Sequence, residues 1–232
     1  MCGDFFVRIV LVVTSDIQLA AKLAAKHHDR FRVVSYLELR MLCTAVARQI
    51  FEAYVGGPGI VICPVLMGGG IPARLVTDAL LGSGLVSDIV PCRIKRYSGV
   101  GEAGEAEFTL PLDPERVKGR IVIGIDDLVD GGQTLEGFTR HANEFGSLEV
   151  QTAVIFAKPG STHQPKFVAE AGVTQWLVMP GEEMDFMQEI VGIDTEVGEM
   201  KPSAQAAYFV GLGLDAAVVR DWQEDAARRP RI

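Results

Sequence analysis

Short apolar runs alternate with stretches of helical periodicity along this chain of 232 residues. Runs rich in Val and Ile predict buried strands, whereas apolar residues that recur every three or four positions predict amphipathic helices. The predicted strands cover residues 8–13, 32–34, 59–66, 90–94, 121–125 and 150–157. The predicted helices cover residues 16–28, 35–54, 73–81 and 135–145. Strands and helices in alternation predict an α/β fold, with a parallel twisted sheet that is flanked by helices.

The starts of two helices carry capping signals. Ser15 or Asp16 is expected to cap the first helix, and Ser35 is expected to cap the second, where Glu38 three residues later completes a capping box. At the end of the first helix, His27 is expected to be a solvated side chain, because it has no partner at the spacing of a metal site.

Three carboxylates follow the predicted strand 121–125 within five residues. Asp126 and Asp127 are adjacent, and Asp130 comes next. Carboxylates accept hydrogen bonds from hydroxyl groups, and their hard oxygens also hold divalent cations. Because the ligands of parallel sheets bind at the carboxyl ends of the strands, we interpret these acids as part of a binding site.

The next four residues form a candidate phosphate loop, Gly131-Gly132-Gln133-Thr134. The glycines let the backbone pass close to a ligand. Gln133 and Thr134 offer main-chain N–H groups at a helix start, where the helix dipole favours an anion. A ligand with vicinal hydroxyls and a phosphate, such as a ribose 5-phosphate, fits the acids and this loop together. The alternative is a solvated surface turn, which three acids beside a glycine pair make a weaker interpretation.

A second glycine-rich turn, Met67-Gly68-Gly69-Gly70, links the predicted strand 59–66 to a helix. Its backbone N–H groups make it a second candidate anion site. A plain connection between strand and helix is the alternative interpretation.

The polar segment 98–107 is open to two interpretations, a mobile lid over the site or an ordinary hairpin with a strand at 108–112. Residues 99–104 match G-x-G-x-x-G literally. No amphipathic helix follows them, and the acid at Glu102 would repel a pyrophosphate, so we reject a dinucleotide-binding fold.

Two later stretches favour a pocket for a flat heterocycle. Lys158 stands where the predicted strand 150–157 leaves the core, and Trp176 offers an aromatic plane near Leu177 and Glu182. Core packing of Trp176 and solvation of Lys158 are the alternatives.

Composition narrows the class of protein. The net charge is −8 and the sequence pI about 5.1, which argues against non-specific binding of nucleic acid. The four cysteines form no C-x-x-C pair, which indicates reduced thiols in a cytoplasmic protein. The apolar run at 5–13 is short and interrupted by Arg8, so we expect neither a signal peptide nor a membrane span.

These motifs resemble those of type I phosphoribosyltransferases, which bind phosphoribosyl diphosphate (PRPP). In that family two acids after an apolar strand lead into a loop of the form D-T-G-G-T. Here the loop reads 130–134, and Gly131 replaces the first Thr. The Met67–Gly70 turn resembles the family's pyrophosphate loop, but Met67 replaces its basic residue. The residues that can supply the missing charge are Arg74, Lys95 and Arg96.

The later stretches resemble the 6-oxopurine branch of that family, most closely the bacterial xanthine–guanine type. Residues 155–159 match its I-F-A-K-P motif. Trp176 and Glu182 match the ends of its W-x-x-x-P-W-(E or D) motif, in which Gly181 replaces the second Trp. The resemblance covers residues 33–183.

The resemblance implies a Mg²⁺-dependent transfer of ribose 5-phosphate from PRPP to the N9 atom of xanthine, guanine or hypoxanthine, in purine salvage. It implies that Asp126 and Asp127 hold the ribose hydroxyls, with Asp127 as a metal ligand, and that Asp130 is the general base at N7 of the purine. Lys158 would then donate to the 6-oxygen. A flexible lid and a small hood, which carries the purine-binding residues Trp176, Leu177 and Glu182, complete the implied fold.

The resemblance also implies three segments, an N-terminal extension at 1–32, a phosphoribosyltransferase domain at 33–183 and a C-terminal helical extension at 184–232. It implies a homo-oligomer, as a dimer or a tetramer. Two alternatives stay open. One is a regulator that binds PRPP or a nucleotide with weakened catalysis, which Met67 and Gly131 favour, and the other is a phosphoribosyltransferase for a different base.

Overall fold

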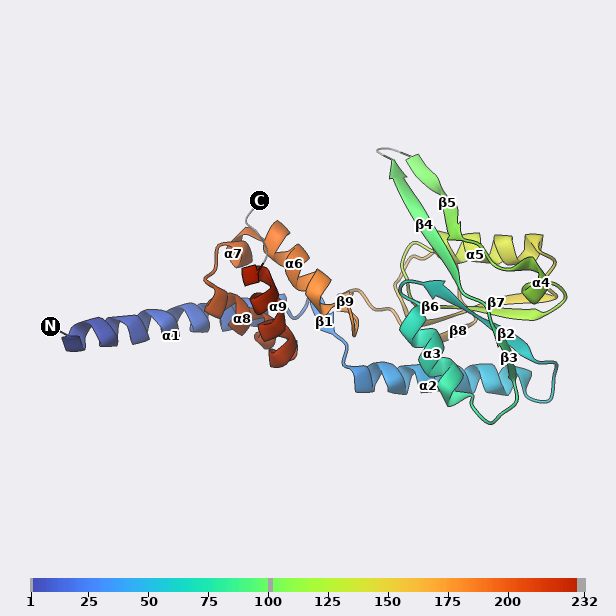
Figure 1. Ribbon diagram of the computed structural model, residues 1–232, viewed down its shortest axis with the longest axis horizontal. Coiled ribbons are helices and arrows are strands. Elements are labelled where there is room, and N and C mark those ends of the chain that lie inside the picture. The colour runs from blue at the N-terminus through green and yellow to red at the C-terminus, as the bar shows by residue number, and fades with distance from the viewer. Residues whose placement is uncertain (1, 100–101, 229–232) are drawn as a thin grey trace. The chain divides into compact units, whose positions relative to one another are not determined.

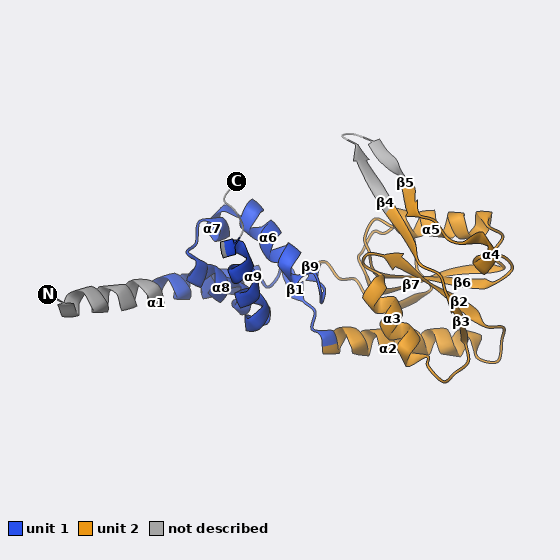
Figure 2. Ribbon diagram, in the orientation of Figure 1, with its two compact units in different colours: residues 1–36, 175–232 blue, residues 37–174 orange. Residues whose placement is uncertain are grey.

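The computed structural model of the chain describes residues 2–99 and 102–228, and within them the side chains of residues 15–94, 107–226 and 228. It divides into two compact units (Figure 2). Residues 37–174 form the central unit, which is unit 2 of the figure. Residues on both sides of them, 1–36 and 175–232, form the terminal unit. The three-part division expected from the sequence stays a prediction.

The central unit is built on one sheet (Figure 1). Its strands are β2 (Ile60–Leu66), β3 (Val86–Ile89), β4 (Cys92–Gly99), β5 (Glu102–Leu110), β6 (Ile121–Val129), β7 (Glu149–Ala157) and β8 (Phe167–Ala171). Its helices are α2 (Tyr36–Tyr54), α3 (Gly70–Ala79), α4 (Pro114–Val117) and α5 (Gln133–Glu144). The strand order is β5-β4-β2-β6-β7-β8, and β3 also pairs with β2. Every pairing is parallel except that of β4 with β5. The predicted α/β class with a mostly parallel, helix-flanked sheet is confirmed.

Helices cover both faces of this sheet, because its central strands are apolar at successive positions. Val61, Cys63 and Val65 of β2 face a buried cluster with Leu135 and Phe138 of α5. In Figure 1, α5 lies on one side of the sheet and α2 and α3 lie on the other. The side chains that α2 buries recur at helical spacing, namely Leu39, Cys43, Val46, Ala47, Ile50 and Tyr54.

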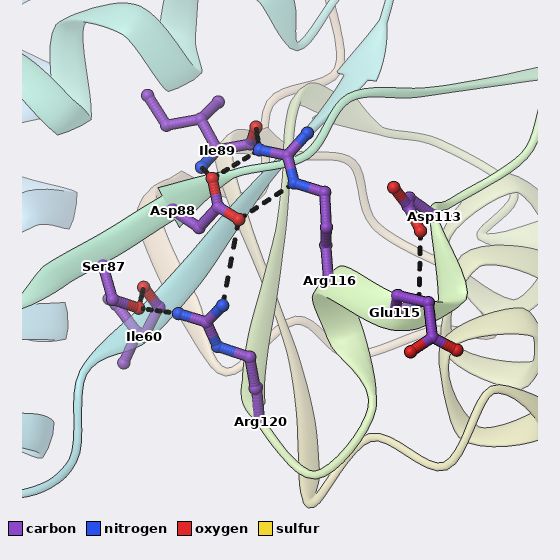
Figure 3. Close-up of polar contacts among 8 residues, drawn as sticks. All are labelled: Ile60, Ser87, Asp88, Ile89, Asp113, Glu115, Arg116 and Arg120. Carbon is purple, nitrogen blue, oxygen red and sulfur yellow. Dashed lines mark hydrogen bonds and ion pairs between the residues drawn. The ribbon is translucent and has the colours of Figure 1, made fainter.

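Two arginines, Arg116 in α4 and Arg120 directly before β6, pair with Asp88 of β3 at the amino end of the sheet (Figure 3). Asp88 accepts hydrogen bonds from Arg116, one of them from Nε at 3.0 Å, and its Oδ2 lies 3.8 Å from Nη1 of Arg120. Arg120 donates to Ser87 at 2.7 Å. The hydrogen bond from Arg116 lowers the pKa of Asp88 below its ordinary value. The network supports the end of the sheet that lies opposite the predicted site.

The terminal unit joins the two ends of the described chain. Its helices are α1 (Cys2–His27), α6 (Glu183–Ile193), α7 (Thr195–Gly198), α8 (Pro202–Gly211) and α9 (Ala216–Arg228). Its two strands, β1 (Phe31–Val33) and β9 (Trp176–Val178), pair in parallel. Aromatic side chains from β1, α6, α8 and α9 fill its core, namely Phe31, Phe186, Tyr208, Phe209 and Trp222.

The prediction of a strand at 8–13 is wrong, because these residues belong to the long helix α1. Ser15 and Asp16, expected to cap a helix, lie within it. A short apolar run is compatible with either element, and length and flanking residues decide only weakly between them. The prediction of a solvated His27 is also wrong. This side chain is buried, and its Nδ1 lies 2.8 Å from the hydroxyl of Tyr208.

The segment 98–107 adopts the hairpin that the sequence left as one of two interpretations. Antiparallel β4 and β5 pair as far as Gly99 and Glu102, and residues 100–101 of the literal G-x-G-x-x-G match lie outside the described residues. Among the residues that the structure describes, no helix combines the length and the apolar character needed to cross a membrane. Cys43, Cys63 and Cys92 are buried free thiols.

Candidate active site

The two glycine-rich turns predicted from the sequence follow neighbouring strands. β2 pairs in parallel with β6, with Pro64 opposite Ile125, so the carboxyl ends of both strands lie together. A Cβ atom on Gly68 would collide with the carboxylate of Asp127. A Cβ atom on Gly69 would collide with the carbonyl oxygen of Ile125 and lie 2.7 Å from that of Val65. Only glycines allow the Met67–Gly70 turn to pack this closely against β6.

The acidic pair lies inside β6, which continues four residues beyond the predicted strand 121–125. Asp126 is only 8% exposed, and its Oδ1 accepts the backbone N–H of Asp127 at 3.0 Å. Burial raises the pKa of Asp126 well above its ordinary value, and the charge of Asp127 acts in the same direction. Burial raises the pKa of Asp127 as well, although hydrogen bonds to its carboxylate oppose the change.

This pair fits the Mg²⁺ ion that the resemblance implies. Two carboxylates that repel each other at a buried site are stabilised in their ionised form by a divalent cation. The described residues contain no group of three His, Cys, Asp or Glu side chains that could hold a metal ion. Mg²⁺ commonly binds through one or two carboxylates and completes its shell with water and substrate phosphates, so two acids suffice.

The phosphate loop, Gly131–Thr134, leads into α5. Gly132 is the N-cap of α5 and has a φ of 100°, a left-handed conformation that favours glycine. Its carbonyl oxygen accepts the N–H of Glu136 at 3.0 Å, which starts the helical hydrogen bonds. The N–H groups of the residues in between, including Gln133 and Thr134, lie in the first turn of α5, where they can bind an anion.

Asp130 and Lys158 are brought together by neighbouring strands. β6 and β7 pair up to Val129 and Ala157, and the N–H of Lys158 then donates to the carbonyl of Val129 at 2.9 Å. The Lys158 ammonium lies 3.3 Å from Oδ2 of Asp130. Asp130 is 63% exposed at its side chain and Lys158 is 23% exposed, so the pair opens to solvent. An incoming base can therefore reach both groups.

The remaining predicted purine-binding residues belong to the terminal unit. Trp176 begins β9 with 49% of its surface exposed, and Leu177 beside it is buried. Glu182 is the N-cap residue of α6, and its N–H donates to the carbonyl of Met179 at 3.0 Å. Their role in binding a base stays a prediction.

Met67 is 74% exposed in the turn after β2, and the peptide bond between Leu66 and Met67 is cis. Of the residues expected to supply the missing positive charge, Arg74 lies 3.9 Å from Asp78 on the same helix. The side chains of Lys95 and Arg96 lie outside the described residues.

The sequence did not point to the loop after Lys158, which packs against the phosphate loop. Thr162 contacts the carbonyl oxygen of Gly131 with both its N–H, at 3.1 Å, and its hydroxyl, at 2.9 Å. A Cβ atom on Gly132 would lie 2.6 Å from the nitrogen of His163. The polar stretch from Ser161 to Gln164, which begins three residues after Lys158, was the available signal.

A cavity of about 670 Å³ lies in the terminal unit, between α1, α7 and α8. None of the predicted site residues lines it. Its wall combines the lysines Lys22, Lys26 and Lys201 with acids and apolar side chains.

Comparison with known proteins gives the family. Residues 34–178 match the family described as the phosphoribosyl transferase domain. A purine phosphoribosyltransferase from Pyrococcus horikoshii has a similar structure, with 24% identity, a TM-score of 0.55, and alignment over 65% of this chain and 92% of that one. A hypoxanthine-guanine phosphoribosyltransferase from Bacillus anthracis aligns at 19% identity with a TM-score of 0.50, over 59% of this chain and 78% of its own.

A hypoxanthine phosphoribosyltransferase from Trypanosoma cruzi aligns at 19% identity with a TM-score of 0.51, over 57% of this chain and 76% of that one. Among curated protein sequences none matches this chain. At these identities the solved structures show that the fold is shared.

Proposed function

The chain belongs to the phosphoribosyltransferase family and is therefore a glycosyltransferase, and from this premise we propose that it transfers ribose 5-phosphate from PRPP to the N9 atom of a 6-oxopurine. The products are a purine nucleoside monophosphate and pyrophosphate. Xanthine, guanine and hypoxanthine are the candidate bases, and the proposed role is purine salvage.

The ion pair of Lys158 with Asp130, at 3.3 Å, is the observation that carries the choice of base. N7 and the 6-oxygen of an oxopurine are neighbours on one edge of the ring. An ammonium can donate to the 6-oxygen while the adjacent carboxylate accepts the proton at N7. Adenine has an amino donor in place of this oxygen, and an ammonium would repel it.

The sugar is proposed to bind along the ends of β2 and β6. The phosphate loop takes the 5-phosphate, and the carboxylates of Asp126, which is buried, and Asp127, which is half-buried, accept hydrogen bonds from the ribose hydroxyls. When the bond from C1 to pyrophosphate breaks, positive charge builds on the ribose ring, and the nearby carboxylates stabilise it. The Met67–Gly70 turn offers backbone N–H groups to the pyrophosphate.

Asp130 is proposed to be the general base. As N9 of the purine bonds to C1, the ring acquires positive charge, and transfer of the N7 proton to the Asp130 carboxylate neutralises it. Asp126 and Asp127 would hold Mg²⁺, which when bound neutralises charge on the departing pyrophosphate.

The test is an assay of pyrophosphate release from PRPP and Mg²⁺ with each of five bases, hypoxanthine, guanine, xanthine, adenine and orotate. We expect turnover with at least one 6-oxopurine and none with adenine or orotate. Turnover of adenine or orotate without any 6-oxopurine would refute the proposal. The Asp130→Asn variant should keep its affinity for PRPP and lose turnover, since it retains the shape but not the base.

A regulatory protein that binds PRPP is the second candidate, because Met67 leaves the pyrophosphate turn without its basic residue and Gly131 lacks the hydroxyl of the family loop. Calorimetry separates the two candidates. Binding of PRPP without release of pyrophosphate for any base would favour the regulator.

We further propose that the enzyme is a homo-oligomer, a dimer or a tetramer, in the cytoplasm. The buried free thiols Cys43, Cys63 and Cys92 suit a reducing compartment. Light scattering coupled to size-exclusion chromatography tests the oligomer directly, and a monomer at micromolar concentration would contradict it.

A further inference from the structure

Two hydrogen-bond donors of Thr162 converge on one carbonyl of the phosphate loop. The Thr162 N–H lies 3.1 Å and its hydroxyl 2.9 Å from the carbonyl oxygen of Gly131. Thr162 follows Lys158 in the connection from β7 to β8, so this contact extends the pairing of β6 and β7 past the ends of both strands. The connection that begins at Lys158, the proposed base-binding lysine, therefore contacts the proposed phosphate loop through Thr162.

This contact fixes the direction of a peptide group. The peptide between Gly131 and Gly132 is planar, and its C=O and N–H point in opposite directions. Because the C=O is held by Thr162, the N–H of Gly132 is turned to the other side of the loop. Glycines at both positions impose little preference of their own on this peptide, so its orientation depends on an outside partner.

The Thr162 hydroxyl also lies 2.6 Å from the carboxylate of Glu136, in the first turn of α5. A hydroxyl has one proton, so it donates to the carbonyl or to the carboxylate at any moment, while the N–H stays on the carbonyl. Both acceptors carry negative charge and would repel a phosphoryl group. Thr162 holds both acceptors on one side of the phosphate loop. The N–H groups at the start of α5 then face the other side, where the phosphate is proposed to bind.

The connection that carries Thr162 is itself held in place. Ser161 donates through its hydroxyl to the carbonyl of His163 at 2.8 Å, and Gln164 donates to the carbonyl of Ser161 at 3.0 Å. Nε2 of His163 lies 2.7 Å from the hydroxyl of Thr152 in β7. These contacts anchor Thr162 to the sheet, so it can act as a fixed support.

We infer that Thr162 is a positioning residue for the phosphate loop, which turns the Gly131 carbonyl and the Glu136 carboxylate away from the 5-phosphate of the substrate. This inference rests on the proposed function, since it assigns the loop to that phosphate. On this assignment Thr162 acts on the substrate only through the Gly131 carbonyl and the Glu136 carboxylate. Its loss therefore weakens binding of the phosphorylated sugar and leaves binding of the base unchanged.

The experiment compares Thr162→Val, Thr162→Ser and Thr139→Val with the wild type in the full-length chain. Thr139 is the matched control, because its hydroxyl also donates to a backbone carbonyl, that of Leu135 in α5, at 2.8 Å. The readouts are the dissociation constant for ribose 5-phosphate by calorimetry, and KM for PRPP and for the base.

We expect Thr162→Val to weaken binding of ribose 5-phosphate about three- to tenfold, the range for one net hydrogen bond. KM for PRPP should rise by a similar factor, with kcat and KM for the base within about twofold of the wild type. Thr162→Ser should restore the affinity, because it keeps the hydroxyl, and Thr139→Val should match the wild type.

If Thr162→Val binds ribose 5-phosphate as tightly as the wild type does, the inference is overturned. Turnover of a 6-oxopurine by the wild-type protein would still support the proposed function in that case. Equal losses for the base and for the sugar would overturn the inference as well, since they would indicate a general structural defect. If the wild type itself binds neither ribose 5-phosphate nor PRPP, the proposed function fails, and the inference fails with it.

Discussion

The sheet fixes the backbone of Lys158, and Asp130 beside it forms an ion pair with its ammonium. The backbone N–H of Lys158 continues the pairing of β7 with β6, and its ammonium lies 3.3 Å from Asp130. The backbone of Lys158 is fixed, while its side chain is 23% exposed. On the proposed function, its ammonium can therefore move from the Asp130 carboxylate to the 6-oxygen of a base without a change in the backbone. The chemistry of single side chains therefore depends on where strands end.

Replacing Lys158 by Met should remove the donor to the 6-oxygen while keeping the length of the side chain. We expect KM for a 6-oxopurine to rise about 10- to 100-fold, because a hydrogen bond from a charged group contributes roughly 1.5–3 kcal/mol. KM for PRPP should stay within about twofold. Steady-state kinetics with each substrate varied in turn measures both.

Lys166→Met is the control for this variant. Lys166 lies before β8, 3.6 Å from Glu149, and neither of the two is a predicted site residue. The control variant should leave both KM values unchanged. A rise in KM for PRPP alone in Lys158→Met would contradict the assignment of Lys158 to the base.

Gly131→Thr should strengthen binding of PRPP, because it adds the hydroxyl that the family loop has at this position. Gly131 is not among the glycines with positive φ, and the atoms nearest to a Cβ there belong to the flexible side chain of Gln133. One added hydrogen bond predicts a two- to tenfold lower KM for PRPP, on the order of 1 kcal/mol. A higher KM, measured by initial rates, would mean that the loop is shaped for glycine.

At the scale of elements, the sequence predicted those strands and turns whose structure depends on neighbouring residues in the chain. The predicted strands at 59–66, 121–125 and 150–157 are confirmed, since runs of apolar β-branched residues bounded by turns suit a buried parallel strand. The prediction for β6 ended four residues early, because the strand continues through the polar residues Asp126, which is buried, and Asp127, which is half-buried. The candidate phosphate loop was recognised from its glycine pair, the acids before it and the predicted helix after it.

Contacts between parts of the chain that are far apart in the sequence were not predicted, although the strand at 32–34 was. The pairing of β1 with β9 joins Phe31 to Trp176, and neither short strand has a local signal that identifies the other. The helical state of residues 8–13 went unrecognised because a short apolar run is compatible with a strand or a helix. Thr162 was missed because its partner Gly131 is 31 residues away.

The junction of α1 with α8 should make the terminal unit sensitive to acid. Burial lowers the pKa of His27 below its ordinary value of 6.5, so the unfolded chain binds more protons below that pH. The free energy of unfolding should be constant above about pH 7 and fall as the pH drops through about 6.5. The fluorescence of both tryptophans, Trp176 and Trp222, follows this unit in urea titrations.

The His27→Gln variant tests whether His27 causes this pH dependence. The variant should be less stable at neutral pH, because it loses the aromatic contacts of the buried ring, but it should lose less stability between about pH 7 and 5.5. An identical pH slope in both proteins would show that another group titrates.

At the scale of the molecule, each unit has its own core, and the predicted residues for PRPP lie in the central one. Ribose 5-phosphate should therefore stabilise the central unit selectively. At one hundred times its dissociation constant, it should add about 2.7 kcal/mol to the free energy of unfolding of that unit. In scanning calorimetry the unfolding transition of the central unit should shift to a higher temperature when ribose 5-phosphate is added. The transition of the terminal unit, which tryptophan fluorescence follows, should keep its temperature.

Equal shifts of both transitions would contradict this expectation, because they would mean that the units unfold together. Glucose 6-phosphate at the same concentration is the control ligand, since it has a phosphate but no ribose.

The terminal unit takes its residues from both ends of the chain, and this has a consequence for biosynthesis. A nascent chain that has just emerged past residue 174 already contains every strand of the central sheet. Its first helix, in contrast, has to wait for α8 and α9 to leave the ribosome before Leu23 and Ala24 find the aromatic side chains that cover them. Translation thus completes the central unit, which carries the candidate PRPP site, before the helices that the terminal unit needs for its core are made.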